Sequence, residues 1–229
     1  MGGLALAAST LHLGRPIHAY RAIRMWLRSW LSREVLLFGA FSNVAALYAA
    51  ALWYSVPGSV LLGGLTAGLG MGGVTATACI YRVASRPSWN TPLTPLRFGA
   101  TTGLLGALWA AAAGAGDTRS LAIAAAAFGA TQVLLVVIGF LRMIGSHGVE
   151  LRGTARLLST RLAPHFVIRG VLLASGGVVL PLLAESSTVL AAAGVLALAG
   201  ELLGRYLFFV SVVPKHMTTP YLAMGSEAA

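Results

Sequence analysis

Residues 12–34 read HLGRPIHAYRAIRMWLRSWLSRE, and apolar sequence lies on both sides of them. The stretch holds five arginines, two histidines, two tryptophans and a glutamate. Ionisable residues are scarce elsewhere, since only 10% of the 229 residues are charged and 57% are hydrophobic. Soluble domains carry about 25% charged residues. The chain is therefore expected to be an integral membrane protein, and residues 12–34 to be a polar link between two of its helices.

Several apolar runs are long enough to cross a bilayer, which takes about 20 residues at about 1.5 Å each. They are residues 35–54, 59–81, 98–116, 120–141, 166–184 and 187–213. Residues 1–13 are apolar but shorter, which indicates an incomplete first helix and a missing segment before it. We expect an all-α integral membrane fold, an antiparallel bundle of about seven transmembrane helices with the first incomplete. Residues 1–229 would form a single transmembrane anchor domain.

The links between the runs carry residues that favour turns. Pro57 and Gly58 separate the second predicted helix from the third, and residues 114–117 and 185–187 are predicted to be tight turns. Residues 89–95, WNTPLTP, are not expected to form regular helix because of their prolines. Residues 149–162 are expected to form a short helix at the membrane interface.

The formal net charge of +10 comes from basic residues in the links. If the predicted spans alternate in direction, every basic residue except Arg119 lies on one side of the membrane. The positive-inside rule places that side in the cytoplasm. A basic face that mates with an acidic subunit is an alternative, and both explanations can hold. Nucleic-acid binding explains the charge poorly, because the basic residues sit between membrane spans.

His12 ends the first predicted helix and Glu34 begins the second, so both are expected near one membrane face. A quinol pocket needs hydrogen-bond partners for the ring oxygens and groups that take up protons near neutral pH. A histidine with a carboxylate suits this, and Arg15 and Arg33 would shape the pocket. The structural alternative is that His12 caps helix carbonyls and that Glu34 pairs with Arg33 or Arg28.

Other polar residues fall inside the apolar runs. Glu201 and Arg205 lie one turn apart in the last predicted helix, and ionisable residues at membrane depth are candidates for function. Their spacing also allows a purely structural pair, so a supporting role is expected for them. Gln132 is expected to bond between helices, and Arg169 to extend toward the basic face.

The basic face is the expected docking surface for a partner. Arg21, Arg28, Trp89 and Asn90 are the candidate docking residues, although residues 89–95 are equally compatible with a rigid connector. Cys79 is the only cysteine, which excludes an internal disulfide and an iron–sulfur cluster of the chain's own. All five histidines lie in or near links, so we expect no haem.

Several motifs occur in a characteristic order. They are HLGRP at 12–16, SWLSRE at 29–34, YR at 81–82 followed by WNTPLTP at 89–95, and GELLGR at 200–205. With them the chain resembles, over essentially its whole length, the membrane-anchor subunit family of dimethyl sulfoxide reductase-type molybdoenzyme complexes. The resemblance implies a haem-free anchor that exchanges electrons between membrane quinone and a four-cluster iron–sulfur subunit. That subunit in turn connects to a molybdopterin catalytic subunit.

The same resemblance implies that His12 and Glu34 take part in quinol binding. It also implies a multi-pass protein of the bacterial cytoplasmic (inner) membrane, here lacking the family's first helix. The RSWLSRE segment and the basic face favour the sulfite-oxidising branch of the family. Two other hypotheses stay open: a transporter or proton-conducting protein that uses Glu34, Glu201 and Arg205, and a structural tether without a working quinone site.

Overall fold

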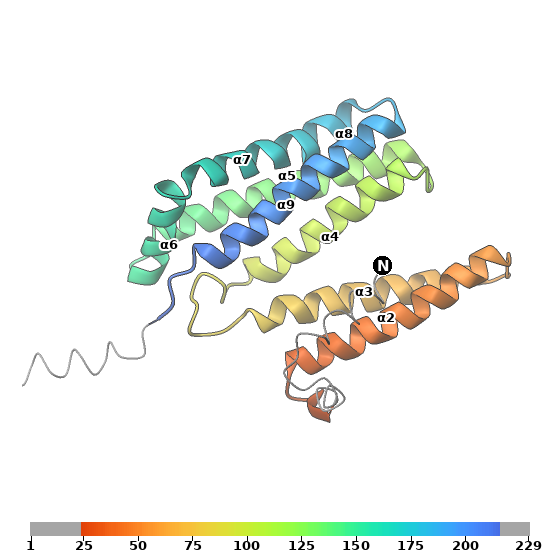
Figure 1. Ribbon diagram of the computed structural model, residues 1–229, viewed down its shortest axis with the longest axis horizontal. Coiled ribbons are helices and arrows are strands. Elements are labelled where there is room, and N and C mark those ends of the chain that lie inside the picture. The colour runs from red at the N-terminus through yellow and green to blue at the C-terminus, as the bar shows by residue number, and fades with distance from the viewer. Residues whose placement is uncertain (1–23, 216–229) are drawn as a thin grey trace, which may run out of the picture. The chain divides into compact units, whose positions relative to one another are not determined.

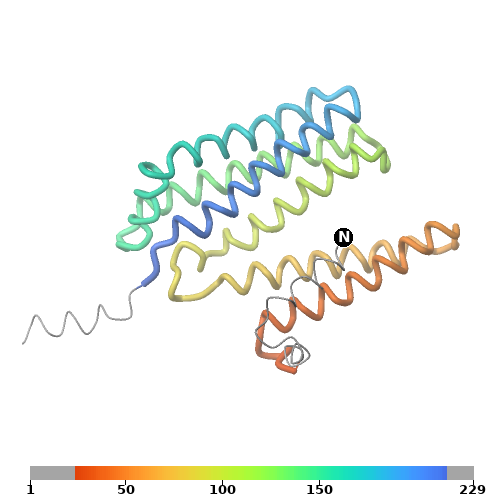
Figure 2. Tube along the Cα trace, viewed as in Figure 1, coloured from red at the N-terminus to blue at the C-terminus, as the bar shows by residue number. Residues whose placement is uncertain are grey.

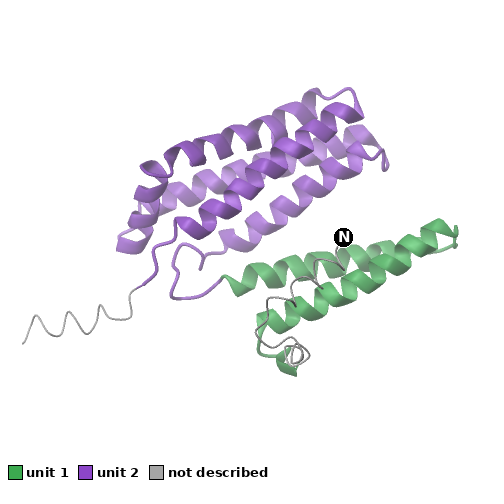
Figure 3. Ribbon diagram, in the orientation of Figure 1, with its two compact units in different colours: residues 1–81 green, residues 82–229 purple. Residues whose placement is uncertain are grey.

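The computed structural model describes residues 24–215, and every regular element within that range is a helix (Figure 1). The chain forms two compact units, residues 1–81 and residues 82–229 (Figure 3), and each is described by itself. The predicted all-α architecture is confirmed. That the two units form one anchor domain stays a prediction.

Unit 1 is a helical hairpin of α2 (Trp30–Trp53) and α3 (Ser59–Ile80). The side chain of Ser29 caps α2 by accepting a hydrogen bond from the backbone N–H of Ser32 at 3.4 Å. Gly58 precedes α3 with φ +81°, a backbone conformation that glycine adopts without strain. The predicted break at Pro57-Gly58 is therefore confirmed.

Small residues of α3 face aromatic residues of α2. A Cβ atom added at Gly73 would lie 2.9 Å from the ring of Phe38, and one added at Gly70 would lie 3.2 Å from the ring of Phe41. Glycines at these positions let the two helices approach closely, as in other membrane proteins. Large apolar side chains such as Leu61 are exposed on the outside of the hairpin, which suits helices surrounded by lipid.

Unit 2 is a bundle whose long helices alternate in direction (Figure 2). Its elements are α4 (Leu93–Ala112), α5 (Thr118–Ile144), α6 (Val149–Ser159), α7 (Ala163–Ala174), the π-helical turn η2 (Ser175–Val179), α8 (Leu180–Leu183) and α9 (Ser187–Val210). The core is built from leucines and alanines: Leu104, Leu108, Ala111, Ala122, Ala125, Leu173, Leu190, Ala193 and Ala197. The predicted short helix is confirmed as α6, and its position at the membrane interface stays a prediction.

The π-helical turn η2 interrupts one long helix, and its sequence explains why. Pro181 lacks the N–H that would bond to the carbonyl of Gly177, and its ring crowds that carbonyl, so an ordinary α-helix cannot run through this segment. The glycines of the turn bring three segments together. A Cβ atom at Gly129 on α5 would lie 2.1 Å from the carbonyl oxygen of Gly177, and one at Gly176 would lie 2.6 Å from the backbone nitrogen of Ala197 on α9.

The six predicted spans correspond to α2, α3, α4, α5, the α7–α8 segment and α9. By length and composition, the helices long and apolar enough to cross a membrane are Trp30–Trp53, Ser59–Ile80, Thr118–Ile144, Ala163–Leu183 and Ser187–Val210. Helix α4, which contains most of the predicted span 98–116, is not among them. Arg97 and several threonines lower its hydropathy, yet it packs against both α5 and α9. The multi-pass prediction is confirmed. Residues 1–13, the predicted incomplete helix, lie outside the described residues.

The largest errors in the predicted boundaries are at two helix starts. Helix α2 begins at Trp30 rather than at residue 35, because the Ser29 cap allows the polar Ser32 and Arg33 to join its first turns. Helix α4 begins at Leu93 rather than at residue 98, so part of the proline-rich stretch is helical after all. Pro95 is tolerated because the first N–H groups of a helix have no partner within it.

Candidate functional site

Arg33 fastens the turn before α2 to the helix itself. Its Nε donates to the carbonyl of Trp26 at 2.9 Å, and one terminal nitrogen donates to the carbonyl of Leu27 at 2.7 Å. Its guanidinium carbon lies 4.3 Å from the centre of the Trp30 ring, at a distance typical of a cation–π contact. The guanidinium is therefore used to hold the end of the predicted 12–34 link in a fixed shape.

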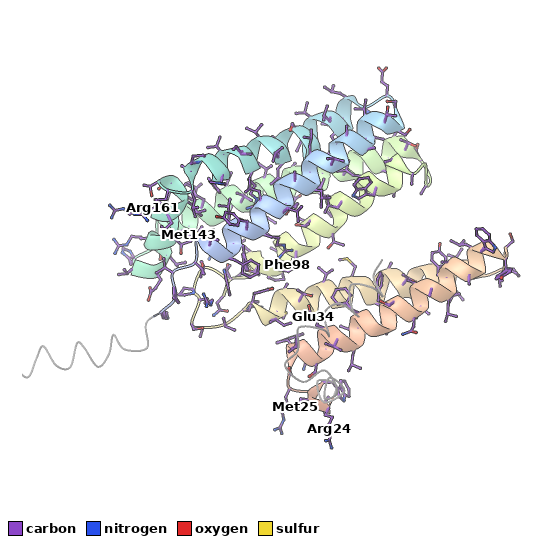
Figure 4. All side chains as sticks on the ribbon, in the orientation of Figure 1. Arg24, Met25, Glu34, Phe98, Met143 and Arg161 are labelled. Carbon is purple, nitrogen blue, oxygen red and sulfur yellow. The ribbon has the colours of Figure 1, made fainter. Side chains whose placement is uncertain are left out.

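Glu34 lies in the second turn of α2 and points to α3 (Figure 4). Its Oε1 accepts a hydrogen bond from the hydroxyl of Thr77 at 2.5 Å, and the side chain is half-buried. The hydroxyl oxygen of Thr77 also lies 3.0 Å from the carbonyl oxygen of Gly73, one turn earlier in the same helix. Because Arg33 is engaged with backbone carbonyls, the structure favours the threonine over Arg33 as the partner of this carboxylate.

Three of the predicted site residues, His12, Arg15 and Arg21, lie outside the described residues. The predicted approach of His12 to Glu34 therefore stays a prediction. Arg28 is exposed in the turn before α2, and its docking role is likewise untested.

Trp89 connects the segment before α4 to the end of α9. Its indole N–H donates to the carbonyl of Phe208 at 2.8 Å, and its ring stacks on the Phe208 ring with 4.8 Å between centroids. The guanidinium carbon of Arg86 lies 4.7 Å from the ring centre of Trp89. The neighbouring Asn90 is exposed. Of Trp89 and Asn90, Asn90 is the more accessible to a partner. Docking by either residue stays a prediction.

A cavity lies inside unit 2, at the end of the bundle where α4 and α7 begin and α5 and α9 end. Its empty space, open mouth included, is about 740 Å³. Figure 4 labels two of its lining residues, Phe98 on α4 and Met143 on α5. Aromatic or aliphatic side chains make up about half of the lining, and polar or charged side chains make up the other half. The charged lining residues are Arg97, Arg169, Glu201 and Arg205.

The carboxylate and one guanidinium of this cavity are deeply buried. Glu201 is 5% exposed and Arg169 is 8% exposed. Arg169 interacts electrostatically with Glu201 and with Arg205, and Arg97 interacts with Arg169 and Glu201. The prediction that Arg169 extends to the membrane surface is wrong, because α9 offers it a buried place beside Glu201.

Glycines make the room for two of the guanidinium groups. A Cβ atom at Gly204 would lie 2.5 Å from Nε of Arg169. A Cβ atom at Gly139 would lie 2.0 Å from a terminal nitrogen of Arg97, the nitrogen that donates to the carbonyl of Leu135 at 2.8 Å. At both positions the space beside the helix backbone is occupied by a guanidinium group, and a residue larger than glycine would displace it.

The remaining polar groups link helices across the cavity. The guanidinium carbon of Arg205 lies 3.5 Å from the centre of the Phe98 ring. The side-chain nitrogen of Gln132 on α5 donates to the hydroxyl of Thr101 on α4 at 3.1 Å, so the predicted interhelical bond of Gln132 is confirmed. Arg205 and Glu201 both line the same cavity, which agrees with a shared role for them.

Sequence reasoning misses two residues that the structure makes prominent. Arg97 falls in a predicted link because the prolines beside it argue against helix, whereas it lies in the second turn of α4. Thr77 gives no signal, because a single threonine in an apolar helix usually bonds to its own backbone. A search for every polar residue within reach of a span end would have found Arg97.

The chain was compared with known proteins. The model of the DMSO reductase anchor subunit (DmsC) family matches residues 1–210. The chain is 35% identical over 166 residues to a sulfite dehydrogenase subunit of Allochromatium vinosum, a match that covers 66% of this chain and 49% of that protein. It thus spans about half the length of that relative. It is 30% identical to the anaerobic dimethyl sulfoxide reductase chain YnfH of Escherichia coli, over 90% of this chain and 77% of that one.

No solved structure matches the chain. The family match covers unit 1 and unit 2 as far as residue 210, and it contains Glu34, the cavity arginines and Glu201. The chain belongs to the DMSO reductase anchor subunit (DmsC) family and is therefore a membrane anchor.

Proposed function

We propose that this chain is the quinone-reactive anchor of a molybdopterin oxidoreductase, passing electrons between membrane quinol or quinone and an iron–sulfur subunit. The observation that carries the proposal is the position of Glu34. It is the only acidic residue before Asp117 in the sequence. It sits half-buried between two apolar helices and accepts a hydrogen bond from Thr77.

The chemistry follows from what a quinol gives up. Oxidation of a quinol to a quinone releases two electrons and two protons. In the proposal, the carboxylate of Glu34 accepts one proton while the Thr77 hydroxyl keeps its other oxygen in place. His12 hydrogen-bonds the second ring oxygen and takes the other proton. The electrons pass to the partner's clusters, and reduction of a quinone runs through the same groups in reverse.

The arginines have a shaping role in this proposal. Arg33 holds the turn at residues 26–27 through two backbone carbonyls, which fixes the direction in which the 12–34 link leaves α2. Arg15 lies further along the same link and would line the pocket near His12. Both residues contribute positive charge on the side of the membrane where we place the partner.

The proposed partners are a four-cluster iron–sulfur subunit and a molybdopterin catalytic subunit, as the resemblance implies. We place the complex in the bacterial cytoplasmic membrane with the basic links facing the cytoplasm. Arg28 and Asn90 are exposed and, with Arg21 and Trp89, are the docking residues of the proposal. The sulfite-oxidising branch and the dimethyl sulfoxide-reducing branch both fit it.

Glu34→Gln in the assembled complex tests the proposal. It removes the proton acceptor and keeps the size of the side chain, so quinol-linked turnover is expected to fall roughly a hundredfold. Turnover with an artificial dye, which feeds the catalytic partner directly, is expected to stay unchanged. Glu185→Gln is the matched control, because Glu185 is exposed in the turn before α9. Unchanged quinol turnover in Glu34→Gln would reject the assignment.

His12→Ala extends the same test to the residue outside the described part of the chain. Loss of quinol turnover with dye activity retained supports a shared pocket with Glu34. If the wild-type complex assembles but responds to no quinone, the chain is a structural tether. If the chain purifies without iron and molybdenum subunits, the transporter hypothesis takes its place.

A further inference from the structure

The cavity of unit 2 takes no part in the function proposed above, yet its charges do not balance. Three guanidinium groups, those of Arg97, Arg169 and Arg205, line it together with a single carboxylate, Glu201. Arginine stays protonated in proteins, so this lining carries two more positive than negative charges. Excess charge at membrane depth is costly unless something compensates it.

The cavity also holds polar atoms with unused hydrogen-bonding capacity. Among the described residues, three buried groups that can donate lack a partner: Nε of Arg97, Nε of Arg169 and the hydroxyl of Ser88, which can also accept. Two buried acceptors lack one as well, Oε1 of Gln132 and Oε1 of Glu201. Gln132 is 1% exposed, so bulk water does not satisfy it. A fitting ligand must therefore both accept and donate hydrogen bonds.

The three arginines of the cavity lie one to two helical turns inside the end of the bundle. Arg97 lies four residues from the start of α4, Arg169 six from the start of α7, and Arg205 five from the end of α9. At about 1.5 Å per residue, the guanidinium-bearing positions lie roughly 6–9 Å inside the end of the bundle. These helix ends lie at the same end of unit 2 (Figure 1).

Glycines beside two of the arginines show that the guanidinium positions are built into the fold. Gly204 leaves room for the guanidinium of Arg169, and Gly139 for that of Arg97. The cations are therefore held in place by helix backbone rather than by flexible packing. Arg97 is fixed further by its bond to the carbonyl of Leu135.

We propose that this cavity binds a phosphate-type oxyanion with a neighbouring hydroxyl group. Phosphatidylglycerol, an anionic lipid headgroup, and free inorganic phosphate both offer that chemistry. The oxyanion accepts hydrogen bonds from Arg97 and Arg169 and offsets the excess positive charge. The hydroxyl donates to Oε1 of Glu201 or of Gln132. Bound in this way, the ligand joins α4, α5, α7 and α9 at one end of the bundle.

The test uses the purified complex and measures its midpoint of thermal unfolding in three conditions. The first is phosphatidylcholine vesicles alone, the second is the same vesicles with inorganic phosphate, and the third is vesicles containing phosphatidylglycerol. A rise of the midpoint in the third condition alone assigns a lipid headgroup, and a rise in the second assigns free phosphate. Native mass spectrometry of the wild type, after exchange into detergent, checks for retained phosphatidylglycerol without any variant.

Variants then locate the effect. Arg169→Gln is expected to weaken the ligand's apparent affinity about tenfold or more, since it removes a charge-assisted hydrogen bond. Arg97→Gln should do the same. Arg161→Gln is the control: Arg161 is exposed and lies at the same end of unit 2 (Figure 4). If Arg161→Gln weakens binding as much as Arg169→Gln, the effect belongs to the charged surface and the proposal fails.

Two further outcomes would overturn the proposal. One is a wild-type complex that neither anion stabilises and that retains no lipid. The other is stabilisation by a short-chain quinone analogue in place of the anions, which would make the cavity a quinone pocket. Should Arg169→Gln fail to assemble, Arg97→Gln and the wild-type lipid measurement still decide the question.

Discussion

Two acids of the chain, Glu34 and Glu201, lie in contrasting surroundings. Glu34 in unit 1 is half-buried, and its described partner is the hydroxyl of Thr77. Glu201 in unit 2 is 5% exposed and shares a cavity with three arginines. The described partner of Glu34 is thus a neutral group. Glu201, by contrast, lies among positively charged groups.

The contrast separates two uses of an acid within one membrane protein. In the function we propose, Glu34 of unit 1 exchanges protons with a ligand, whereas Glu201 of unit 2 offsets buried arginines and helps to hold the bundle together. The predictions below test that division, starting with the largest expected effect.

Glu201→Ala should be the most damaging substitution. It removes the only carboxylate that offsets three guanidinium groups in the cavity. Breaking a buried charge pair by removing one partner costs about 3–5 kcal/mol. Thermal unfolding of the purified complex measures the loss.

Glu34→Ala is the matched comparison in unit 1. It removes one hydrogen bond to Thr77, which is worth about 1 kcal/mol. Equal losses in the two variants would contradict the division of roles, as would a larger loss in Glu34→Ala.

Gly204→Ala should also destabilise unit 2. Its new Cβ atom would lie 2.5 Å from Nε of Arg169, and Arg169 is itself buried. Overpacking of this kind costs about 1–3 kcal/mol. Gly106→Ala in α4 is the control, because a Cβ atom there meets nothing within 4 Å. That control should be neutral or slightly stabilising, since alanine favours helix.

The helices and the membrane class follow from the sequence because they depend on the length and polarity of each run. Helix boundaries follow less well, because they depend on local hydrogen bonds. The Ser29 cap extends α2 over Arg33 and Glu34. The tolerance of a first helical turn for proline extends α4 over Pro95.

The candidate site follows only in part. The potential importance of Glu34 and Glu201 is visible in the sequence, since charges are scarce in apolar runs. The partners of these two acids cannot be read from the sequence. Thr77 lies 43 positions from Glu34, and Arg169 lies on a different helix from Glu201. Which polar groups meet depends on how helices pack, and a single sequence carries no record of that.

Thr77→Val sharpens the comparison on the side of unit 1. It leaves the carboxylate of Glu34 without its hydroxyl partner, so the acid is less well positioned for a ligand. Quinol-linked turnover is expected to fall about fivefold, in line with the loss of one hydrogen bond of about 1 kcal/mol. Dye-linked turnover should not change.

Thr75→Val is the control for Thr77→Val. Thr75 is exposed on the same helix and donates to the carbonyl of Met71 at 2.8 Å. Equal turnover in the two variants would show that the hydroxyl of Thr77 has no specific role beside Glu34.

Asp117 gives the smallest effect, because it is an acid outside the membrane-spanning helices. It caps α5, and hydrogen bonds from the side chain and backbone of Ser120 lower its pKa from the ordinary value of 3.8. A pKa that is lowered in the folded state stabilises the protein at pH values above the pKa of the unfolded state. This contribution is lost as the pH falls through the pKa of the folded state.

Asp117→Asn keeps the cap and removes the titration. The variant should therefore match the wild type near neutral pH and lose less stability than the wild type below pH 3.8. Thermal unfolding measured from neutral to acidic pH checks this, and identical pH profiles would show that the cap carries no charge-dependent stability.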